Sequence, residues 1–235
     1  MAVALPLRAQ DISFNPAITE ADFQKFSRLI AQGIFPSPVQ PAGASGLLRF
    51  DVGIAATGVK IDPNATYWQR AVGKDFTVGS NYVAVPRLVA SKGLSAATIA
   101  ASYAKVQGTN GSILGGSLDV PVINGGLVKP TLALRGSYAT LRGIDVYNLN
   151  TYGLELFLGK GFGPITPYGA IGKQRSNATG NIPATTRTPE ITLTDRSTIT
   201  RYTAGAQVNL VIFRLAVEAN QAEQRSYGVK LSFGF

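Results

Sequence analysis

Large apolar residues occupy every second position along much of the chain after residue 46, and this period of two is typical of β-strands. The pattern is clearest where Leu154, Leu156 and Leu158 alternate with Glu and Phe. About ten segments follow it, and a count between eight and twelve fits the chain. We expect strands at residues 46–60, 80–92, 94–106, 111–123, 130–142, 149–160, 165–176, 199–211, 212–221 and 227–235.

The residues between the apolar positions indicate what the second face of the sheet meets. They are mainly Gly, Ala, Ser, Thr and Asn, with about one charge per strand, whereas the wet face of a soluble sheet usually carries many charges. We therefore predict an all-β fold: a transmembrane, antiparallel, up-and-down β-barrel whose apolar face meets lipid. A soluble all-β binding protein, in which the same apolar residues face a core, is the alternative.

Charged residues on the second face would line a narrow lumen, where an unpaired charge costs several kcal/mol. Six of them are basic and four are acidic, so we expect ion pairs across the lumen, with small residues making room for the long side chains. The candidates are Arg49, Asp51, Arg87, Asp119, Arg135, Glu155, Arg201, Arg214, Glu218 and Lys230. The excess of basic residues would favour anions if the lumen conducts.

The chain before residue 46 predicts a different kind of element. Thr19 is a suitable cap for an amphipathic helix at about residues 19–33, and residues 36–46 are rich in Pro, Gly and Ser, as linkers are. One face of the helix carries an apolar stripe of Phe23, Phe26, Leu29 and Ile30. Three roles are open for this stripe: it plugs the lumen, it docks onto a partner or a membrane surface, or it packs against its own barrel mouth.

The segments together suggest three parts. Residues 1–10 are similar to the end of a signal peptide. Residues 11–45 then form a periplasmic segment with the helix and the linker, and residues 46–235 form the barrel.

Predicted connections between strands alternate between long or polar and short. The long ones are expected at residues 62–79, 107–111, 143–148, 176–198 and 222–226. Outer-membrane barrels have long outer loops and short periplasmic turns, so an even strand count places both termini and the helix at the short-turn end. Five residues near expected strand starts are typical of an interfacial girdle: Tyr82, Tyr152, Tyr168, Tyr202 and Tyr227.

The composition excludes most enzyme mechanisms. The chain has no Cys and no His, which rules out disulfides, thiolate nucleophiles, Ser-His-Asp triads and the commonest metal ligands. We therefore expect no enzymatic activity, no cofactor and no metal site. The net charge is +9, but the 22 Lys and Arg residues are scattered singly, so a nucleic-acid partner is not expected.

The last ten residues read SYGVKLSFGF, with apolar residues at alternate positions up to the end. The alternating residues are Tyr227, Val229, Leu231, Phe233 and Phe235. A final Phe that closes such a run resembles the assembly signal of bacterial outer-membrane β-barrel proteins. The resemblance covers about residues 46–235. It implies location in the outer membrane of a Gram-negative bacterium, insertion by the barrel-assembly machinery and contact with outer-membrane lipid.

Some barrels of this class are enzymes, namely the omptin proteases, the outer-membrane phospholipase and the lipid A deacylase. Their sites use His, and none of their residues carries over to a chain without His. We expect a non-enzymatic barrel with a largely filled lumen and a structural or surface-interaction role, with the helix or outer loops available to a protein partner. The alternatives are a narrow porin-like channel, plugged or gated by the helix, and a carrier of a small apolar ligand.

Overall fold

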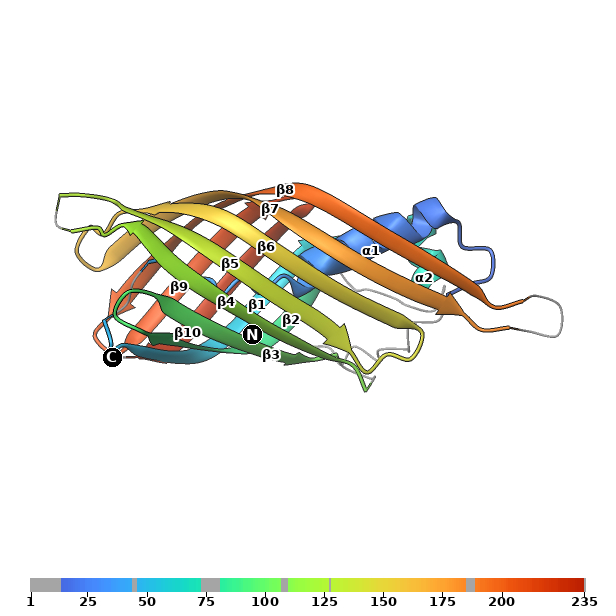
Figure 1. The fold of residues 1–235 in the computed structure, drawn as a ribbon, viewed down its shortest axis with the longest axis horizontal. Helices are drawn as coiled ribbons and strands as arrows, with labels where there is room; N and C mark the ends of the chain where they lie inside the picture. The colour runs from blue at the N-terminus through green and yellow to red at the C-terminus, as the bar shows by residue number, and fades with distance from the viewer. Residues whose placement is uncertain are drawn as a thin grey trace.

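The computed structural model describes residues 14–43, 46–72, 81–106, 110–126, 128–184 and 189–234. In these residues ten strands surround a common axis, and two helices lie at one end (Figure 1). In chain order the elements are α1 (Glu20–Ile34), β1 (Phe50–Lys60), α2 (Thr66–Val72), β2 (Tyr82–Gly93), β3 (Thr98–Lys105), β4 (Ser112–Ile123), β5 (Thr131–Arg142), β6 (Tyr147–Gly159), β7 (Ile165–Ile182), β8 (Ile191–Leu210), β9 (Phe213–Gln221) and β10 (Arg225–Gly234).

Each strand pairs antiparallel with its neighbours in the sequence, and β1 also pairs with β10. In that closing pair Ile54 lies opposite Leu231. The described strands therefore form a closed, ten-stranded, up-and-down barrel, and the predicted fold class is confirmed. Closure pairs the backbone groups that an open sheet would leave at its edges.

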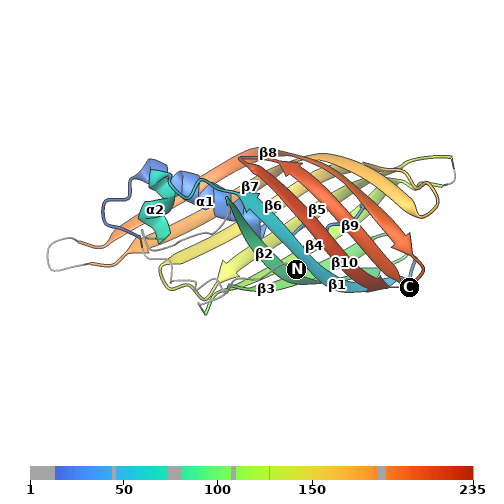
Figure 2. The same cartoon turned by 180° about the vertical axis from the view of Figure 1, so that it is seen from behind.

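The two ends of the barrel differ, and we name them the helix end and the turn end. α1, α2 and the projecting β7–β8 hairpin mark the helix end, whereas β1 begins and β10 ends at the turn end (Figures 1 and 2). The predicted strict alternation of connection lengths is wrong. The connections at residues 143–146 and 222–224, at the helix end, are shorter than the one at residues 124–130, at the turn end.

The β7–β8 hairpin is longer than the sequence pattern predicts. We expected a loop at residues 176–198, but the two strands pair as far as Ile182 opposite Ile191. The added residues are mainly Asn, Thr, Ser and Gly on both faces, so no apolar alternation marks them as strands. α2 was also not predicted, because its seven residues are too few to show a helical period.

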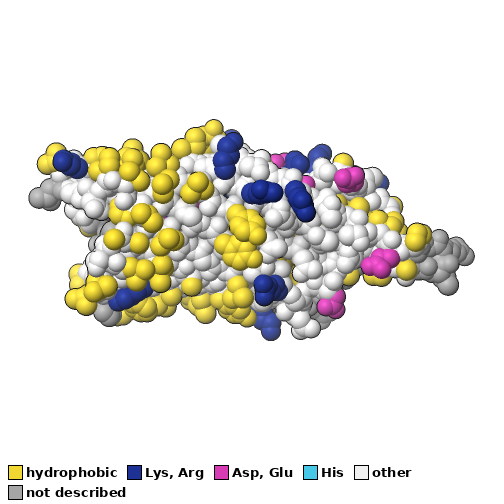
Figure 3. Space-filling view, in the orientation of Figure 1, with side chains coloured by type: hydrophobic (Ala, Val, Ile, Leu, Met, Phe, Trp, Pro, Cys, Tyr) yellow, Lys and Arg dark blue, Asp and Glu magenta, His cyan; other side chains and the backbone are white. Residues whose placement is uncertain are grey.

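Most large apolar side chains of the strands point away from the barrel axis, as the alternation predicts, although some, such as Leu149 and Phe157, are buried inside it. The outward-facing ones are exposed, and they include Val52, Ile54, Leu88, Ile99, Leu114, Leu118, Val120, Leu134, Leu154, Leu156, Leu158, Ile171, Leu215, Val217, Val229, Leu231 and Phe233. Figure 3 shows hydrophobic side chains gathered over the turn-end half of the visible face, whereas the other half is mainly polar. We call this surface the apolar band.

A capping box starts α1. The hydroxyl of Thr19 accepts a hydrogen bond from the backbone N–H of Asp22, and the Asp22 carboxylate accepts one from the backbone of Thr19. Arg70 of α2 forms an ion pair with the same carboxylate at 2.7 Å. Although burial opposes ionisation, these hydrogen bonds from Thr19 and Arg70 hold the pKa of Asp22 below its usual range.

The apolar stripe of α1 lies inside the helix end of the barrel. Phe23, Phe26 and Leu29 are buried in the main apolar cluster, and Ile30 packs against it. α1 contacts α2 and several strands, β8 most of all. The expectation that the helix lies at the turn end, beside the last strand, is therefore wrong.

Candidate functional site: the filled lumen

An extended stretch of chain runs through the barrel between α1 and β1, and we call residues 35–43 the lumen segment. Its residues from Phe35 to Gln40 are all buried. At its far end the carbonyl oxygen of Gly43 accepts a hydrogen bond from Thr98, the first residue of β3. The segment thus crosses the lumen from the helix end to the turn end. The stretch that the composition suggested as a linker is the filling of the barrel.

Arg87 of β2 anchors the start of the lumen segment. Its Nη1 donates to the carbonyl oxygen of Phe35 at 2.7 Å, and its Nη2 donates to that of Gly33 at 3.0 Å. Nη2 also donates to the hydroxyl of Thr57 on β1 at 3.0 Å. Hydrogen bonds from a charged donor are stronger than neutral ones, so this side chain ties the segment to two strands of the wall.

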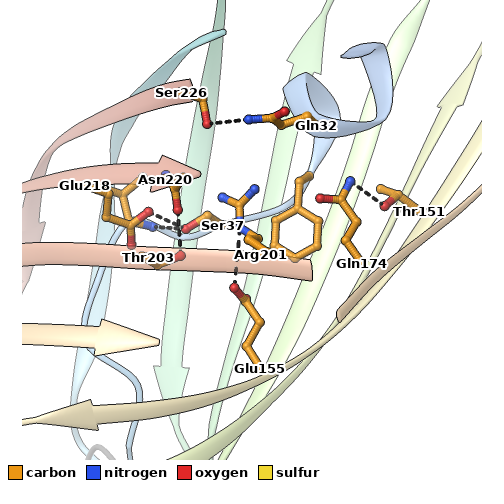
Figure 4. Close-up of polar contacts among 12 residues, drawn as sticks. Gln32, Ser37, Thr151, Glu155, Gln174, Arg201, Thr203, Glu218, Asn220 and Ser226 are labelled. Atoms are coloured by element: carbon orange, nitrogen blue, oxygen red, sulfur yellow. Dashed lines mark hydrogen bonds and ion pairs between the residues drawn. The ribbon is translucent and has the colours of Figure 1, made fainter. Parts of the chain in front are cut away.

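Two buried glutamines fix the last turn of α1 in the same way (Figure 4). Gln32 Nε2 donates to the carbonyl oxygen of Gln224 at 2.6 Å and to the hydroxyl of Ser226 at 3.1 Å. Gln174 Nε2 donates to the carbonyl oxygen of Ala31 at 2.8 Å and to the hydroxyl of Thr151 at 3.2 Å. Neither glutamine is among the residues predicted from the sequence, because that prediction rests on charge and both side chains are neutral.

Polar contacts continue along the second half of the lumen segment. Ser37 donates a hydrogen bond to Glu218 Oε2 at 2.8 Å. Gln40 Oε1 accepts one from Lys230 Nζ at 2.8 Å, and the Gln40 carbonyl accepts one from Arg135 at 3.2 Å. Side chains of β5, β9 and β10 therefore hold this half from different sides.

Glycines of the wall lie where the lumen segment passes. A Cβ added to Gly115 would lie 2.6 Å from Pro36, and one added to Gly153 would lie 2.5 Å from the Phe35 ring. The prediction that small residues make room for long charged side chains describes Gly172, whose missing side chain leaves space for Glu155. It also describes Gly234, whose missing side chain leaves space for Arg214, whereas at Gly115 and Gly153 the lumen segment uses the space.

Val39, in the middle of the segment, is backbone-strained. Its φ is 49°, in the left-handed region that β-branched residues avoid. It is fully buried in a small apolar cluster with Ala55, Val89 and Ala216. Such a conformation costs roughly 1–3 kcal/mol and persists only where the surroundings impose it. The wall thus holds the segment in a conformation that it would leave if released.

Seven of the ten predicted lumen residues take part in ion pairs, and one group gathers on Asp51 of β1. Arg214 Nη1 lies 2.7 Å from its Oδ2, and Lys230 Nζ lies 3.0 Å from its Oδ1. Ser232 donates a further hydrogen bond at 2.9 Å. Three partners thus surround one buried carboxylate, which compensates its loss of water.

The other group follows one register row across β4, β5, β6 and β8. Asp119 accepts two hydrogen bonds from Arg135, from Nε at 2.6 Å and Nη2 at 2.8 Å. Glu155 lies opposite Arg135 and next to Gly172, and it reaches across to Arg201 at 3.4 Å. Figure 4 shows the side chains of Glu155 and Arg201 pointing toward one another. The guanidinium carbon of Arg201 lies 4.3 Å from the centre of the Phe35 ring.

Three predicted lumen residues form no ion pair among the described residues. Arg87 binds carbonyl groups of the segment, and Glu218 accepts hydrogen bonds from Ser37 and from Tyr168, the latter at 2.9 Å. Arg49 lies at the turn end and is exposed. Tyr168 is buried on the inner face, so its predicted place in an interfacial girdle is wrong.

A polar cavity of about 310 Å³ opens at the turn end. Its lining includes Arg49, Asp51 and Arg214 of the wall, and Gln40 and Gly43 of the lumen segment. The segment therefore forms the bottom of this cavity.

The described residues contain no group of three or more Asp and Glu side chains that could hold a metal ion. Asp51, Asp119, Glu155 and Glu218 each contact basic or hydroxyl groups, as described above. No helix in the described part of the chain is long and apolar enough to span a membrane.

The segment predicted to act as an assembly signal forms β10. Tyr227, Val229, Leu231 and Phe233 are exposed on its outward face. Phe235 lies outside the described residues.

A protein-family model described as a family of unknown function (DUF6588) matches residues 92–235, which is more than half of the chain. The chain belongs to this family. The matched residues run from the end of β2 to the end of the chain, so the match does not cover α1, the lumen segment or β1. Comparison with curated proteins found no match.

Several solved β-barrel structures are distantly similar. The N-terminal β-barrel domain of Pseudomonas aeruginosa OprF is 14% identical, with 81% of this chain and 100% of that chain covered and a TM-score of 0.37. LpxR from Salmonella typhimurium is 10% identical, with 79% and 100% covered and a TM-score of 0.40. Neisserial surface protein A is 8% identical, with 79% and 95% covered and a TM-score of 0.31. Similarity at this level carries no inference about function.

Proposed function

We propose that this protein is a non-enzymatic barrel of the bacterial outer membrane whose lumen is closed at rest by its own lumen segment. The observation that carries the proposal is the burial of Phe35 to Gln40 and their hydrogen bonds to β2, β5, β9 and β10. Because the lumen is filled, we assign the function of the protein to its outer surfaces. Its role is then structural or one of surface interaction, with the helix end available to a protein partner.

The surface of the barrel supports the location in a membrane. Exposed large apolar side chains lie on all ten strands, and they gather over the turn-end half of the face that Figure 3 shows, where a soluble protein would need polar side chains. α2 and the β7–β8 hairpin extend the helix end, which supports an orientation with the helix end outside the cell. The outward alternation along β10 supports insertion by the barrel-assembly machinery.

A gated channel with a mild anion preference is the second candidate, and the strain at Val39 favours it. Release of the lumen segment would relieve that strain and would leave Arg87 without two of its hydrogen-bond partners. The described wall of the emptied lumen would carry five buried basic and five buried acidic side chains, and Arg49 at the turn end adds one basic charge, which favours anions slightly.

Single-channel conductance of the refolded full chain in planar bilayers tests these proposals. A Cβ added to Gly228 would lie 3.2 Å from Val39. The Phe ring of Gly228→Phe would therefore occupy space that the lumen segment fills, and it should displace the segment. Gly136→Phe is the matched control, because an added Cβ there meets nothing within 4 Å. We expect no conductance from the native chain or the control.

Conductance steps in Gly228→Phe alone would support the gated channel, and anion selectivity would support the basic lumen. Absence of conductance from all three proteins, together with heat-modifiable mobility on a gel, would support the filled barrel. A native chain that conducts would contradict the closed lumen. A chain that stays monodisperse without detergent would contradict the membrane location.

A further inference from the structure

Within the described part of the chain, the outward face of the strands carries charges of one sign only. Its charged residues are Lys60, Lys92, Lys105, Arg142, Lys173, Arg175, Arg196 and Arg225, and all are exposed. The acidic strand residues are Asp51, Asp119, Glu155, Asp195 and Glu218, and all are buried on the inner face. The wall of the barrel therefore presents basic groups to its surroundings with no acidic neighbours on the same face.

These basic residues are not spread evenly over the barrel. Lys60, Lys105 and Arg142 end their strands at the helix end, and Arg225 begins β10 there. Only Lys92 of the described set lies at the turn end. In Figure 3 dark-blue side chains cross the middle of the visible face, between the apolar band and the polar half. The basic residues thus follow the boundary of the apolar band on the side of the helix end.

The densest group lies on β7 and β8, and we call Lys173, Arg175 and Arg196 the rim cluster. Arg175 pairs with Thr198 and Arg196 pairs with Asn177, so the two arginines are diagonal neighbours on one face. Lys173 is two residues from Arg175, and its Nζ donates to the hydroxyl of Thr200 at 2.9 Å. Among the described residues none of the three has an acidic partner within ion-pair distance. Their mutual repulsion favours an external anion.

The neighbours of the rim cluster indicate the depth at which it lies. On β6, Tyr152 pairs with Arg175 and Leu154 pairs with Lys173. Tyr152 also stacks with Tyr138 of β5, with ring centres 5.0 Å apart. Outward-facing tyrosines beside aliphatic residues are typical of the boundary between acyl chains and headgroups. The cluster therefore begins at the level where lipid phosphates lie.

We propose that the rim cluster binds the phosphate groups of an anionic lipid of the outer leaflet. The position of the cluster against the apolar band favours a membrane lipid over a soluble polyanion, which would need no contact with acyl chains. Arg side chains bind phosphate oxygens in pairs, and each basic residue near a membrane surface adds to the attraction. This inference rests on the proposed location and orientation in the outer membrane.

Native mass spectrometry of the refolded full chain tests the proposal, with diphosphorylated lipid A and its dephosphorylated form as probes. Lys173→Gln/Arg175→Gln/Arg196→Gln removes the rim cluster. Lys92→Gln/Lys129→Gln/Lys160→Gln removes the same charge near the turn end and is the matched control. We expect the native chain and the control to retain the phosphorylated probe. The rim variant should retain at least about tenfold less of it.

Equal retention of both probes by the native chain would overturn the proposal, as would unchanged retention by the rim variant. Displacement of the lipid by millimolar inorganic phosphate would show a site for free phosphate and would also overturn it. Heat-modifiable mobility in the same samples separates this failure from failure of the proposed function. A barrel that inserts and folds without retaining the lipid contradicts only the rim cluster.

Discussion

The guanidinium of Arg87 and the carbonyl oxygen of Phe35 lie 2.7 Å apart, and this contact joins β2 to the first residue of the lumen segment. The same side chain holds the end of α1 through Gly33. One residue of the wall therefore anchors both parts of the filling, although it is separated from them by about fifty positions in the sequence.

Arg87→Met should loosen the lumen segment without opening the barrel. Each buried hydrogen bond from a charged donor contributes about 1.5–3 kcal/mol, and the variant loses both bonds to the segment. We expect faster hydrogen exchange at residues 33–43 and brief conductance steps. Arg87→Lys keeps the charge but loses the planar fork of the guanidinium, so its exchange rates should lie between those of Arg87→Met and the native chain. Unchanged exchange in Arg87→Met would contradict the anchoring role.

Val39→Cys/Gly228→Cys should lock the lumen segment to β10. The chain has no Cys of its own, so the two thiols can pair only with each other. An added Cβ at Gly228 lies 3.2 Å from Val39 Cγ2, a separation that suits a disulfide. We expect quantitative oxidation, measured by mass. When the pair is combined with Arg87→Met, oxidation should suppress the conductance steps and reduction should restore them. A pair that stays reduced under oxidant would place the segment elsewhere.

Glu155→Gln should destabilise the barrel by about 3–5 kcal/mol, because it leaves the buried charge of Arg201 without its carboxylate. The midpoint of heat-modifiable mobility measures the effect. The double variant Glu155→Gln/Arg201→Gln removes both charges and should recover much of the loss. If the double variant were as unstable as the sum of the two single variants, the two side chains would not be coupled.

Leu156→Arg tests whether the apolar band meets lipid. Leu156 is exposed in the middle of the band, and an Arg at the bilayer midplane of a barrel costs about 2–4 kcal/mol. Thr194→Arg is the control, because Thr194 is exposed on the projecting hairpin, where the cost should be about 0–1 kcal/mol. Unfolding in phospholipid vesicles at increasing denaturant measures both. Equal effects would contradict the membrane location.

Acid should loosen the contact between α1 and α2 at Asp22. Because the folded protein holds the pKa of Asp22 below the ordinary value of 3.8, its stabilising effect is present above that value and is lost as the pH falls through the lowered pKa. Trp68, the single Trp of the chain, packs on Phe26 at 5.8 Å and reports the contact.

Trp68 emission should therefore be constant from pH 7 down to about 5 and should shift to longer wavelength in stronger acid. Asp22→Asn should show the shifted emission already at pH 7. Glu20→Gln, in the same first turn, is the control and should behave like the native chain. An emission shift at the same pH in Asp22→Asn and the native chain would assign the acid effect to another group.

The strands and the direction of their faces could be predicted because they depend on local alternation. Each strand in the band shows its outward-facing residues at every second position, as Leu154, Leu156 and Leu158 do. The ion-pair partners could be named as a set, since their charge and inward position are both local properties. Their pairing could not, because Glu155 reaches Arg201 only across Gly172 of the intervening strand.

The sequence by itself determined an antiparallel barrel of about ten strands, with its apolar residues outward and the predicted ion-pair residues inward, because side-chain alternation in a strand follows from backbone geometry. Only the tertiary structure decided what fills the barrel and from which end. The lumen segment has no period, and its polar backbone is satisfied by side chains such as Arg87, Arg135 and Thr98 that are distant in the sequence. From the sequence alone, a stretch rich in Pro, Gly and Ser is therefore interpreted as a linker. The side chains that bind it inside the barrel are distant in the sequence.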